Sequence, residues 1–504
     1  MSWRLCVRFF RLRLGRLRIR RFIVADYIEK FKDLIEILGK EYVKTEPDIT
    51  AEYAVDNVAP KAVVFPKNTD QVAQVVKFSN QENLAIVARG SGTKMAMGNP
   101  PSKLDLVLCT ARMNHMLDVD TSNLTVTVEA GVKFRDIQAR LATQEDRCYL
   151  PLEDLGAEGD EIICSDRSHS GCFIPIDPPY ANQATIGGII ATNSTGPRRL
   201  LYNLPRDSII GIRLVAPNGD ILGMGGKTVK NVSGYDVSKL MVGSLGTLGI
   251  LCEMTMRLLP LPEKMQTLLI SFATFSEASA FAERVFETTL LPAAVEIMNG
   301  EAYKHLALND KPGFDSKNYV AAVALESFIP AVDRMLTEIL EMAKGGGAKA
   351  DAVFEEDEHR SFWLAMSNLS ATLDNKFSGL IKAKLNYPLS LGKGIIESGE
   401  SIFSQANLNY IVQTHAGNGI CHTGLLLDIK DTAATDKAVA ALGQLLGRCR
   451  EIDGNLIIQS APADVKDKLK IWGEVGSHFV VMKRLKSQLD PSGIMSPGRF
   501  VEGL

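Results

Sequence analysis

The sequence lacks the cysteine spacing on which many metal and redox centres depend. Its eight cysteines are scattered over 504 residues, and no two form a Cys-x-x-Cys pair. This argues against a zinc ribbon, a ferredoxin-type iron–sulphur motif or a haem-attachment motif in this chain. Cys164 and Cys172 are near enough in sequence to form a disulfide or bind a metal, but two loop thiols are the simpler interpretation. Scattered thiols suit a reducing compartment, so a cytoplasmic location is expected.

Long apolar runs and a strong excess of one charge are also missing. No segment approaches the roughly 18 apolar residues that a membrane helix needs, so we expect membrane association to be at most peripheral, at the inner membrane. A net charge of −3 and a pI of about 6.2 argue against general nucleic-acid binding. The length favours about three domains.

Acidic residues are absent from the first 21 residues, which contain eight arginines. Such a segment can form a basic amphipathic helix at an anionic membrane, or serve as a transit peptide. It can also lie upstream of the true start and be dispensable. We favour this last interpretation and treat residues 1–24 as a basic extension outside the folded domains.

Residues 25–261 show strand and helix patterns that predict one domain. A short apolar strand at Ala62–Phe65 precedes a helix capped near Thr69 or Asp70, and a second strand follows at Ala85–Ala88. This β-α-β unit has no Gly-x-Gly-x-x-Gly at its first turn, which argues against a dinucleotide-binding Rossmann fold. Further along, Asn218-Gly219 is typical of a hairpin turn.

The pattern changes after Leu261. Two strand-like runs, TLLISFA and YVAAVALE, each precede an amphipathic helical segment, which predicts an α+β layer with an antiparallel sheet over residues 262–430. A last segment, 431–504, contains a long helix, a strand at Leu456–Ile458 and a closing helix. No internal sequence repeat is visible.

Two glycine-rich stretches carry most of the functional information. The first, Arg89-Gly90-Ser91-Gly92-Thr93, follows a strand directly. Glycine lets backbone N–H groups approach an anion closely, although a plain tight turn would also explain this loop. The second stretch contains a cluster of small residues: Ala184, Thr185, Gly187, Gly188, Ala191, Thr192, Asn193, Ser194 and Gly196. So much flexible backbone costs entropy and adds little core, so it suits a surface that lies against a flat ligand.

Three longer motifs carry a family resemblance: ATIGGIIAT at 184–192, KNVSGYD at 230–236 and GSLGTLGI at 243–250. From Ala51 onward the chain resembles the FAD-linked oxidase family with a vanillyl-alcohol-oxidase-type flavin domain, and within it the flavin subunits of bacterial glycolate oxidase and D-lactate dehydrogenase. The resemblance implies an α+β fold. A two-subdomain PCMH-type FAD-binding domain would be followed by a ferredoxin-like α+β substrate or cap domain and a C-terminal helical segment that returns to the flavin.

The resemblance also assigns residues to FAD. The first glycine loop, with Arg89, would hold the pyrophosphate through Gly90, Ser91, Gly92 and Thr93. The isoalloxazine and adenine moieties would be lined by Asp177, Ala184, Thr185, Gly187, Gly188, Asn193, Gly249 and Ile250. Some members attach FAD covalently to a histidine in the first loop. Here that loop, RGSGTKMAMG, has no histidine or cysteine, so FAD is expected to be held non-covalently.

A second constellation, Thr414 to His422, contains two histidines at the ends of a glycine turn. His415 and His422 can converge on one metal or one carboxylate, and the resemblance implies a divalent metal that polarises the substrate. The family's third ligand comes from a Glu-His-Gly turn, but residues 457–462 contain no acid or histidine. A metal, hydrogen bonds to substrate or flavin, and a purely structural role therefore all remain open for these histidines.

Other positions both depart from and match the family pattern. In the family, a substrate-binding arginine follows a tryptophan of the cap by three residues. Here Trp363 is followed at that spacing by Met366. Ile420 replaces a usual asparagine, and Ser496 begins the C-terminal flavin contact in place of asparagine. By contrast, Lys382 stands six residues before Pro388, as the family's substrate lysine does.

The resemblance, taken with these features, implies FAD-dependent oxidation of a small 2-hydroxy acid, glycolate or D-lactate. His415 or His422 would take the hydroxyl proton, and Lys382 would pair with the carboxylate. Because this chain has no cluster motif of its own, reoxidation of the flavin needs oxygen, a quinone or a partner with its own redox centre. The resemblance to glycolate oxidase flavin subunits implies that the electrons pass to an iron–sulphur partner subunit. The alternative is a non-catalytic FAD-binding subunit of a glycolate oxidase-type complex.

Overall fold

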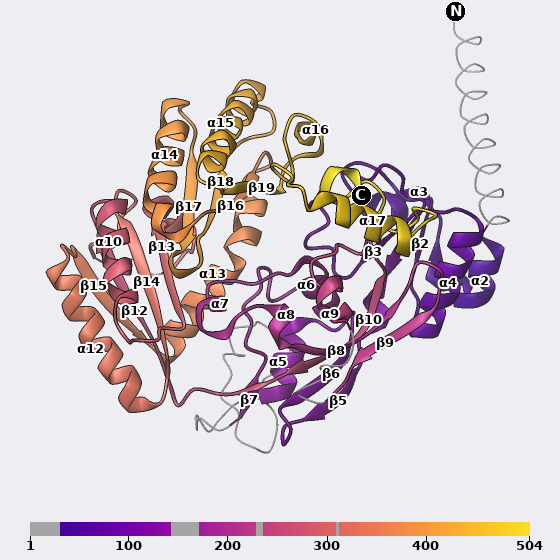
Figure 1. Ribbon diagram of the computed structural model, residues 1–504, viewed down its shortest axis with the longest axis horizontal. Coiled ribbons are helices and arrows are strands. Elements are labelled where there is room, and N and C mark those ends of the chain that lie inside the picture. Colours follow the sequence, from indigo (N-terminus) through magenta and orange to yellow (C-terminus); the bar gives the residue numbers. More distant parts are fainter. Residues whose placement is uncertain (1–30, 143–170, 228–234, 309–311) are drawn as a thin grey trace, which may run out of the picture.

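The computed structural model describes residues 31–142, 171–227, 235–308 and 312–504. The basic extension 1–24, Cys164 and most of the 230–236 motif lie outside the described residues. In Figure 1 the N-terminal domain, coloured indigo to magenta, lies beside a cap domain coloured pink to orange. The yellow C-terminal segment runs from the cap back over the N-terminal domain.

The first subdomain of the N-terminal domain is a four-stranded sheet with the order β1-β2-β4-β3. Its elements are β1 (Val43–Lys44), β2 (Ala62–Val64), α4 (Thr69–Gln81), β3 (Ile86–Arg89) and β4 (Leu106–Cys109). The predicted β-α-β unit is present, but β4 lies between its two strands and is parallel to both. The Asn68 side chain caps α4 by accepting a 3.0 Å hydrogen bond from the Gln71 backbone N–H, one residue before the predicted cap.

The second subdomain is a five-stranded antiparallel sheet with the order β5-β6-β10-β8-β9. Its strands are β5 (Met116–Asp120), β6 (Thr125–Glu129), β8 (Ile209–Val215), β9 (Ile221–Gly225) and β10 (Ile250–Arg257). The predicted hairpin is confirmed, since Val215 pairs with Ile221 across the turn and Gly219 adopts a φ of +83° there. Two helices border this sheet, α5 (Phe134–Ala142) and α6 (Ile186–Thr192).

The cap is one eight-stranded antiparallel sheet built from two β-α-β-β-α-β units joined edge to edge through β13 and β17. The first unit contains β12 (Lys264–Phe272), α10 (Phe275–Phe286), β13 (Ala294–Asn299), β14 (Tyr319–Ser327), α12 (Ile329–Gly345) and β15 (Ala350–Glu355). The second contains β16 (Ile381–Asn386), α14 (Gly392–Gln405), β17 (Tyr410–His415), β18 (Ile420–Leu425), α15 (Thr432–Glu451) and β19 (Asn455–Ser460). Each unit has the ferredoxin-like strand order, so the α+β expectation with a ferredoxin-like cap is confirmed.

The two faces of the cap sheet differ in what covers them. Helices α10, α12, α14 and α15 bury one face, where Ile381, Ala383 and Leu385 of β16 join a large apolar core. The linking helix α13 (Glu356–Lys376) packs apolar residues such as Met366 on the other face. Because strand residues alternate between faces, Lys382 and Lys384 lie on the side opposite the helical core.

The segment expected over 431–504 divides in two. Helix α15 and strand β19 complete the cap sheet. The chain then continues through α16 (Ala463–Lys466) and α17 (Phe479–Leu489) to the N-terminal domain, where it returns to β3. There the Ile86 N–H donates to Ile494 O at 2.7 Å, and the Ser496 N–H donates to Ile86 O at 2.8 Å. Within the described parts of the chain, no helix has the length and apolarity to cross a membrane.

Candidate functional site

A narrow cleft of about 100 Å³ lies between three backbone segments of the N-terminal domain. The segments are the loop after β3, the turn into α6, and the residues that precede β10. Most of the residues predicted for the cofactor line this cleft: Arg89, Gly90, Ser91, Gly92, Thr93, Ala184, Thr185, Gly187, Gly188, Gly249 and Ile250. The structure therefore brings together two glycine stretches that are far apart in sequence.

The close approach of these segments requires glycine. A Cβ placed on Gly90 would lie 2.0 Å from the Thr185 Oγ1, and one on Gly187 would lie 2.8 Å from the Ala130 carbonyl oxygen. Gly92 has a φ of +86°, a conformation that side chains disfavour. The cleft is thus walled by backbone, which can supply N–H donors to an extended anionic group.

Two buried cations from the C-terminal segment hold the outer part of the first glycine loop. Arg499 donates to Met95 O at 2.6 Å and to Met97 O at 2.5 Å. Lys466 forms a 2.8 Å ion pair with Asp56 and also donates to backbone carbonyls of the same loop. Sequence reasoning missed both cations, because nothing local to residues 466 or 499 indicates that they reach this loop.

A larger cavity of about 350 Å³ opens between the N-terminal domain and the cap. It lies next to the narrow cleft, with which it shares five lining residues: Thr93, Lys94, Pro179, Thr192 and Ser194. The predicted cofactor residues Asp177 and Asn193 line this cavity, as do the predicted catalytic residues His415, His422 and Lys382. A ligand in the cleft and a second molecule in the cavity would therefore lie side by side.

The histidines reach the cavity through the register of three cap strands. Lys384 of β16 lies opposite His422 of β18, which lies opposite Gln413 of β17. Residues directly opposite each other in antiparallel strands share a face. All three side chains line the cavity, so this face of the cap sheet forms one wall of it.

His415 is held by a buried acid that sequence reasoning did not identify. Its Nδ1 lies 2.6 Å from Oε1 of Glu296 on β13, and the Gln413 Nε2 donates to the second carboxylate oxygen at 2.9 Å. Burial raises the pKa of Glu296 and lowers the pKa of His415. The only sequence signal was an acid within the apolar run AAVEIM, which indicates a buried carboxylate with a partner.

His422 is oriented by an amide. Its Nδ1 lies 2.9 Å from the Gln459 Oε1. Because that oxygen can only accept, Nδ1 carries the proton and Nε2 keeps its lone pair. The ring centroids of His415 and His422 are 5.0 Å apart. Burial and then the nearby His415 lower the pKa of His422, so both rings are neutral near pH 7.

This donor set does not fit a divalent metal. No group of three or more histidine, cysteine, aspartate or glutamate residues converges within the described part of the chain. The third position is occupied by the neutral amide of Gln459, where a carboxylate would be needed. Two imidazoles and an amide are better suited to hydrogen bonding with a bound molecule.

Lys382 lies in the cavity as predicted, but it already has a counter-charge. Its Nζ donates to both carboxylate oxygens of Asp374 at 2.8 Å and to the Tyr180 hydroxyl at 2.7 Å. Burial lowers the pKa of Lys382, although Asp374 opposes this effect.

Three further cations line the cavity and were not predicted: Lys94, Arg199 and Lys384. Burial, then Lys382 and Lys384, lower the pKa of Lys94 to about 7. Burial and then Arg199 lower the pKa of Lys384. Lys384 could have been found from sequence, since it alternates with Lys382 in the strand IKAKLN and must share its face.

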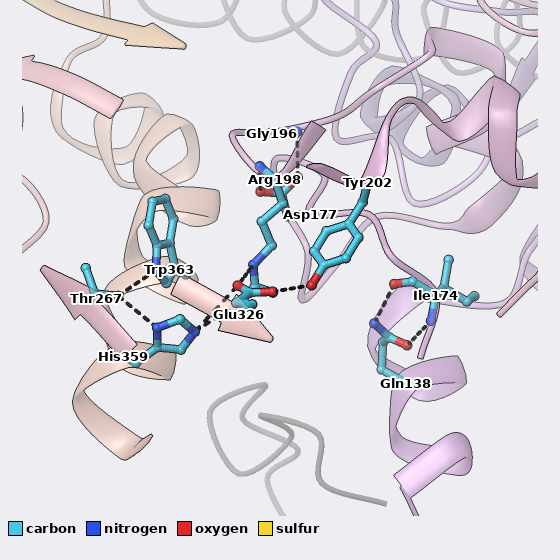
Figure 2. A network of polar contacts seen from close by, with 10 residues as sticks. All are labelled: Gln138, Ile174, Asp177, Gly196, Arg198, Tyr202, Thr267, Glu326, His359 and Trp363. Atoms are coloured by element: carbon cyan, nitrogen blue, oxygen red, sulfur yellow. Dashed lines mark hydrogen bonds and ion pairs between the residues drawn. The ribbon is translucent and has the colours of Figure 1, made fainter. Parts of the chain in front are cut away.

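A buried polar network, drawn in Figure 2, joins the loop that carries Arg199 to the cap. The Asp177 carboxylate accepts hydrogen bonds from the backbone N–H groups of Gly196 and Arg198, both at 2.9 Å. Burial raises the pKa of Asp177 to about 7. Arg198 forms a 2.8 Å ion pair with Glu326 of β14, which also accepts from the Tyr202 hydroxyl at 2.7 Å. This network fixes one wall of the cavity against the other.

Comparison with protein families gives two matches. A model described as "FAD binding domain" matches residues 60–153 and 167–237. A second, described as "FAD linked oxidases, C-terminal domain", matches residues 261–459. Together they span the two domains that enclose the cavity.

Individual proteins match along most of their length. The glycolate oxidase subunit GlcD of Bacillus subtilis is 29% identical over 461 residues, which covers 90% of this chain and 91% of that protein. The D-lactate dehydrogenase of Anaerostipes hadrus is 24% identical and covers 95% of this chain and 98% of that protein. Among solved structures, 4-ethylphenol oxidase from Gulosibacter chungangensis has a TM-score of 0.70 at 18% identity, with 95% and 97% of the two chains covered.

Proposed function

Because the chain belongs to the FAD-linked oxidase family, with FAD as its cofactor, we propose that it oxidises a small 2-hydroxy acid to the 2-oxo acid. One observation carries this proposal. The backbone-walled cleft lies beside a cavity that combines two neutral imidazoles with several cationic side chains. A hydroxyl proton acceptor and a carboxylate partner are the two functions that such a substrate needs.

The cleft fits the extended part of FAD, and we assign the predicted residues accordingly. Arg89, Gly90, Ser91, Gly92 and Thr93 would hold the pyrophosphate. The small residues Ala184, Thr185, Gly187, Gly188, Gly249 and Ile250 would contact the dinucleotide, with Asp177 and Asn193 on the cavity side where the ring would lie. The first loop offers no attachment residue, so the cofactor would be non-covalent.

Oxidation of a 2-hydroxy acid removes a hydride from the α-carbon and a proton from the hydroxyl. FAD, when bound, supplies the hydride acceptor. The Nε2 lone pair of His415 or His422 would accept the proton. Glu296, held at 2.6 Å from the Nδ1 of His415, would stabilise the imidazolium that forms. The Glu296 partner favours His415 as the base, because the Nδ1 of His422 is hydrogen-bonded only to the neutral amide of Gln459.

The relatives suggest which acids to test. The similar proteins from B. subtilis and A. hadrus are a glycolate oxidase subunit and a D-lactate dehydrogenase. We therefore propose glycolate or D-lactate as substrate. The decisive experiment is anaerobic addition of each acid to the purified FAD-loaded chain, with bleaching of the visible flavin absorbance as the readout.

His415→Gln provides the matched variant for that experiment. It should slow bleaching by about 10²–10⁴-fold while FAD content stays the same, because a positioned general base contributes about that factor. His478→Gln, which alters a histidine that does not line the cavity, is the control. Rapid bleaching of His415→Gln and His422→Gln alike would contradict a histidine base.

A second candidate function is a non-catalytic FAD subunit of a larger oxidase complex. Gln459 in place of a metal ligand and Met366 in place of a substrate arginine favour it. Under this alternative the purified chain binds FAD, but neither acid bleaches it, and bleaching appears only when the native partner subunits are added.

We also propose that electrons leave through a separate iron–sulphur protein. No cluster or haem motif occurs in the sequence, so reoxidation of the flavin needs oxygen, a quinone or a partner with its own redox centre. We place the complex in the cytoplasm, with at most peripheral contact with the inner membrane. Affinity purification from native extract should recover a cysteine-rich subunit. A chain that purifies alone and consumes oxygen as fast as it consumes substrate would disprove this proposal.

A further inference from the structure

Two cations in the interdomain cavity form no direct ion pair within the described residues. Lys384 and Arg199 both line the cavity, and within the described residues neither side chain has a hydrogen bond or ion pair with an acid. Burial lowers the pKa of Arg199, and the nearby Asp177 and Asp207 oppose this effect without contacting its guanidinium. We propose that Arg199, with Lys384, binds the substrate carboxylate, and that Lys382 does not. This inference rests on the proposed function and deepens it by assigning the residues that select an anionic substrate.

Lys382 is poorly placed for an added anion, because its charge is already neutralised. Its ammonium group is within 2.8 Å of both oxygens of Asp374, and its remaining bond goes to the Tyr180 hydroxyl. An incoming carboxylate would have to compete with a bidentate carboxylate that is already in place. It would also meet the negative charge of Asp374 directly.

Unlike Lys382, the side chains of Lys384 and Arg199 are not hydrogen-bonded to a carboxylate within the described residues. Placing a charged group away from water without a hydrogen-bonded acid is costly, so a site with two cations that form no direct ion pair favours an anionic ligand. Lys384 lies opposite His422 in the paired strands, and the centroid of the His422 ring is 5.0 Å from that of the His415 ring. Arg199 lines the same cavity. Burial first, and then Arg199 and Lys384, lower the pKa of His415. They also act on each other, as Arg199 lowers the pKa of Lys384. The two cations therefore converge near the proposed base.

Arg199 also supplies from the N-terminal domain what the cap lacks. Met366 of α13, the position of the absent arginine, lines the same cavity as Arg199. The loop that carries Arg199 is fixed by the Asp177 carboxylate and by the ion pair of Arg198 with Glu326 (Figure 2). Arg199 is the first residue of the short helix α7 (Arg199–Tyr202), and a planar guanidinium on a fixed backbone can bind a carboxylate through two parallel hydrogen bonds. The carboxylate would then be held between the two domains.

The test measures binding of oxalate, a carboxylate that carries no α-hydrogen, to the FAD-loaded chain through the change in flavin absorbance. Arg199→Met and Lys384→Met should each raise the Kd of oxalate roughly 10- to 100-fold, because charge-assisted hydrogen bonds are lost. Arg199→Lys should recover part of the affinity. FAD content per chain should stay at the wild-type level in all three variants.

Two controls separate this site from the alternatives. Arg206→Met changes an exposed arginine outside the cavity and should leave the Kd unchanged. The double variant Lys382→Met with Asp374→Asn removes the neutral pair together and should change the Kd less than about threefold. A larger loss of affinity in this double variant than in Arg199→Met would overturn the proposal.

The remaining outcomes are also decisive. If Arg199→Met lowers FAD content while oxalate affinity per bound flavin is unchanged, Arg199 serves the cofactor and the proposal fails. It also fails if wild type does not bind oxalate at millimolar concentrations. If oxalate binding depends on Arg199 but no 2-hydroxy acid bleaches the flavin, the anion site stands and the proposed oxidation fails. If acids bleach the flavin with the same KM in Arg199→Met, the oxidation stands and the anion site fails.

Discussion

Arg198 of the N-terminal domain and Glu326 of the cap form a 2.8 Å ion pair across the domain interface. The Glu326 side chain is 1% exposed and that of Arg198 is 14% exposed. Figure 2 shows His359, Thr267 and Trp363 continuing this network into the cap. The Thr267 Oγ1 lies 2.8 Å from both the His359 Nδ1 and the Trp363 Nε1. The position of one domain against the other is thus set by charge and hydrogen bonding.

The first prediction concerns this ion pair. Glu326→Ala should lower the free energy of unfolding by about 3–5 kcal/mol, because it leaves the Arg198 guanidinium buried without its partner. Asp333→Ala is the matched control: its ion pair with Lys264 is similarly short, at 2.6 Å, but lies at the surface, with Asp333 55% exposed. Its loss should cost about 1 kcal/mol or less. Urea unfolding followed by circular dichroism measures the free energy of unfolding of both variants. Equal losses would contradict a special contribution of the buried Arg198–Glu326 ion pair.

The second prediction concerns how FAD is held. Acid precipitation of the yellow protein should release all of the flavin into the supernatant, because residues 89–98 include no histidine or cysteine. Flavin that remains with the pellet would show a covalent link elsewhere. Gly187→Ala should weaken FAD binding roughly tenfold or more, since its Cβ would meet the Ala130 backbone and push the cleft walls apart. Gly394→Ala, with open space at its Cβ, should bind FAD normally.

Local patterns predicted much of this molecule. The alternation of strands and helices predicted the antiparallel α+β layer of the cap, and the hairpin at Asn218-Gly219 follows from turn chemistry alone. The glycine stretches line one cleft, and His415, His422 and Lys382 line one cavity. These features depend on short-range spacing or on motifs that are contiguous in sequence.

Long-range pairing accounts for what the sequence did not predict. Glu296 reaches His415 across 119 residues, and Arg198 reaches Glu326 in another domain. Strand pairing also determines that β4 lies between β2 and β3, and that the ferredoxin-like unit is repeated in the cap. Such pairing depends on the packing of the whole sheet and leaves no periodic signal in the residues themselves.

The third prediction is a pH dependence of stability that originates in the cap, away from the cavity. Glu400 on α14 is 8% exposed, and both of its oxygens accept from the Tyr319 hydroxyl at 2.9 Å. Burial raises its pKa from 4.5 to about 7. The folded state therefore binds this proton more tightly than the unfolded state does. The contribution of this proton to the free energy of unfolding, roughly 3 kcal/mol, is complete below pH 4.5 and is lost as the pH rises to about 7.

Glu400→Gln tests this assignment because it keeps the shape and cannot ionise. The difference in melting temperature between pH 5 and pH 8 should be smaller in Glu400→Gln than in wild type. Glu341→Gln, at an exposed position on α12, should retain the wild-type pH profile. A Glu400→Gln profile that matches wild type would show that the carboxyl is ionised throughout this range.

The last prediction concerns the metal that the histidine turn does not fit. After dialysis against Mn²⁺ or Zn²⁺ and removal of excess ion, the wild-type chain should retain less than one metal per chain, and EDTA should leave substrate-dependent bleaching unchanged. Gln459→Glu should bind metal much more tightly, because it places a carboxylate beside His422, with His415 next to it. Two imidazoles and one carboxylate form a common set for divalent transition metals. Elemental analysis of both proteins gives the stoichiometry, and Gln459→Ala controls for loss of the amide.

Stoichiometric metal in wild type would mean that a third ligand comes from residues outside the described part of the chain. Gln459→Glu without metal would mean that the two histidines are too firmly held by Glu296 and the sheet to turn toward one ion.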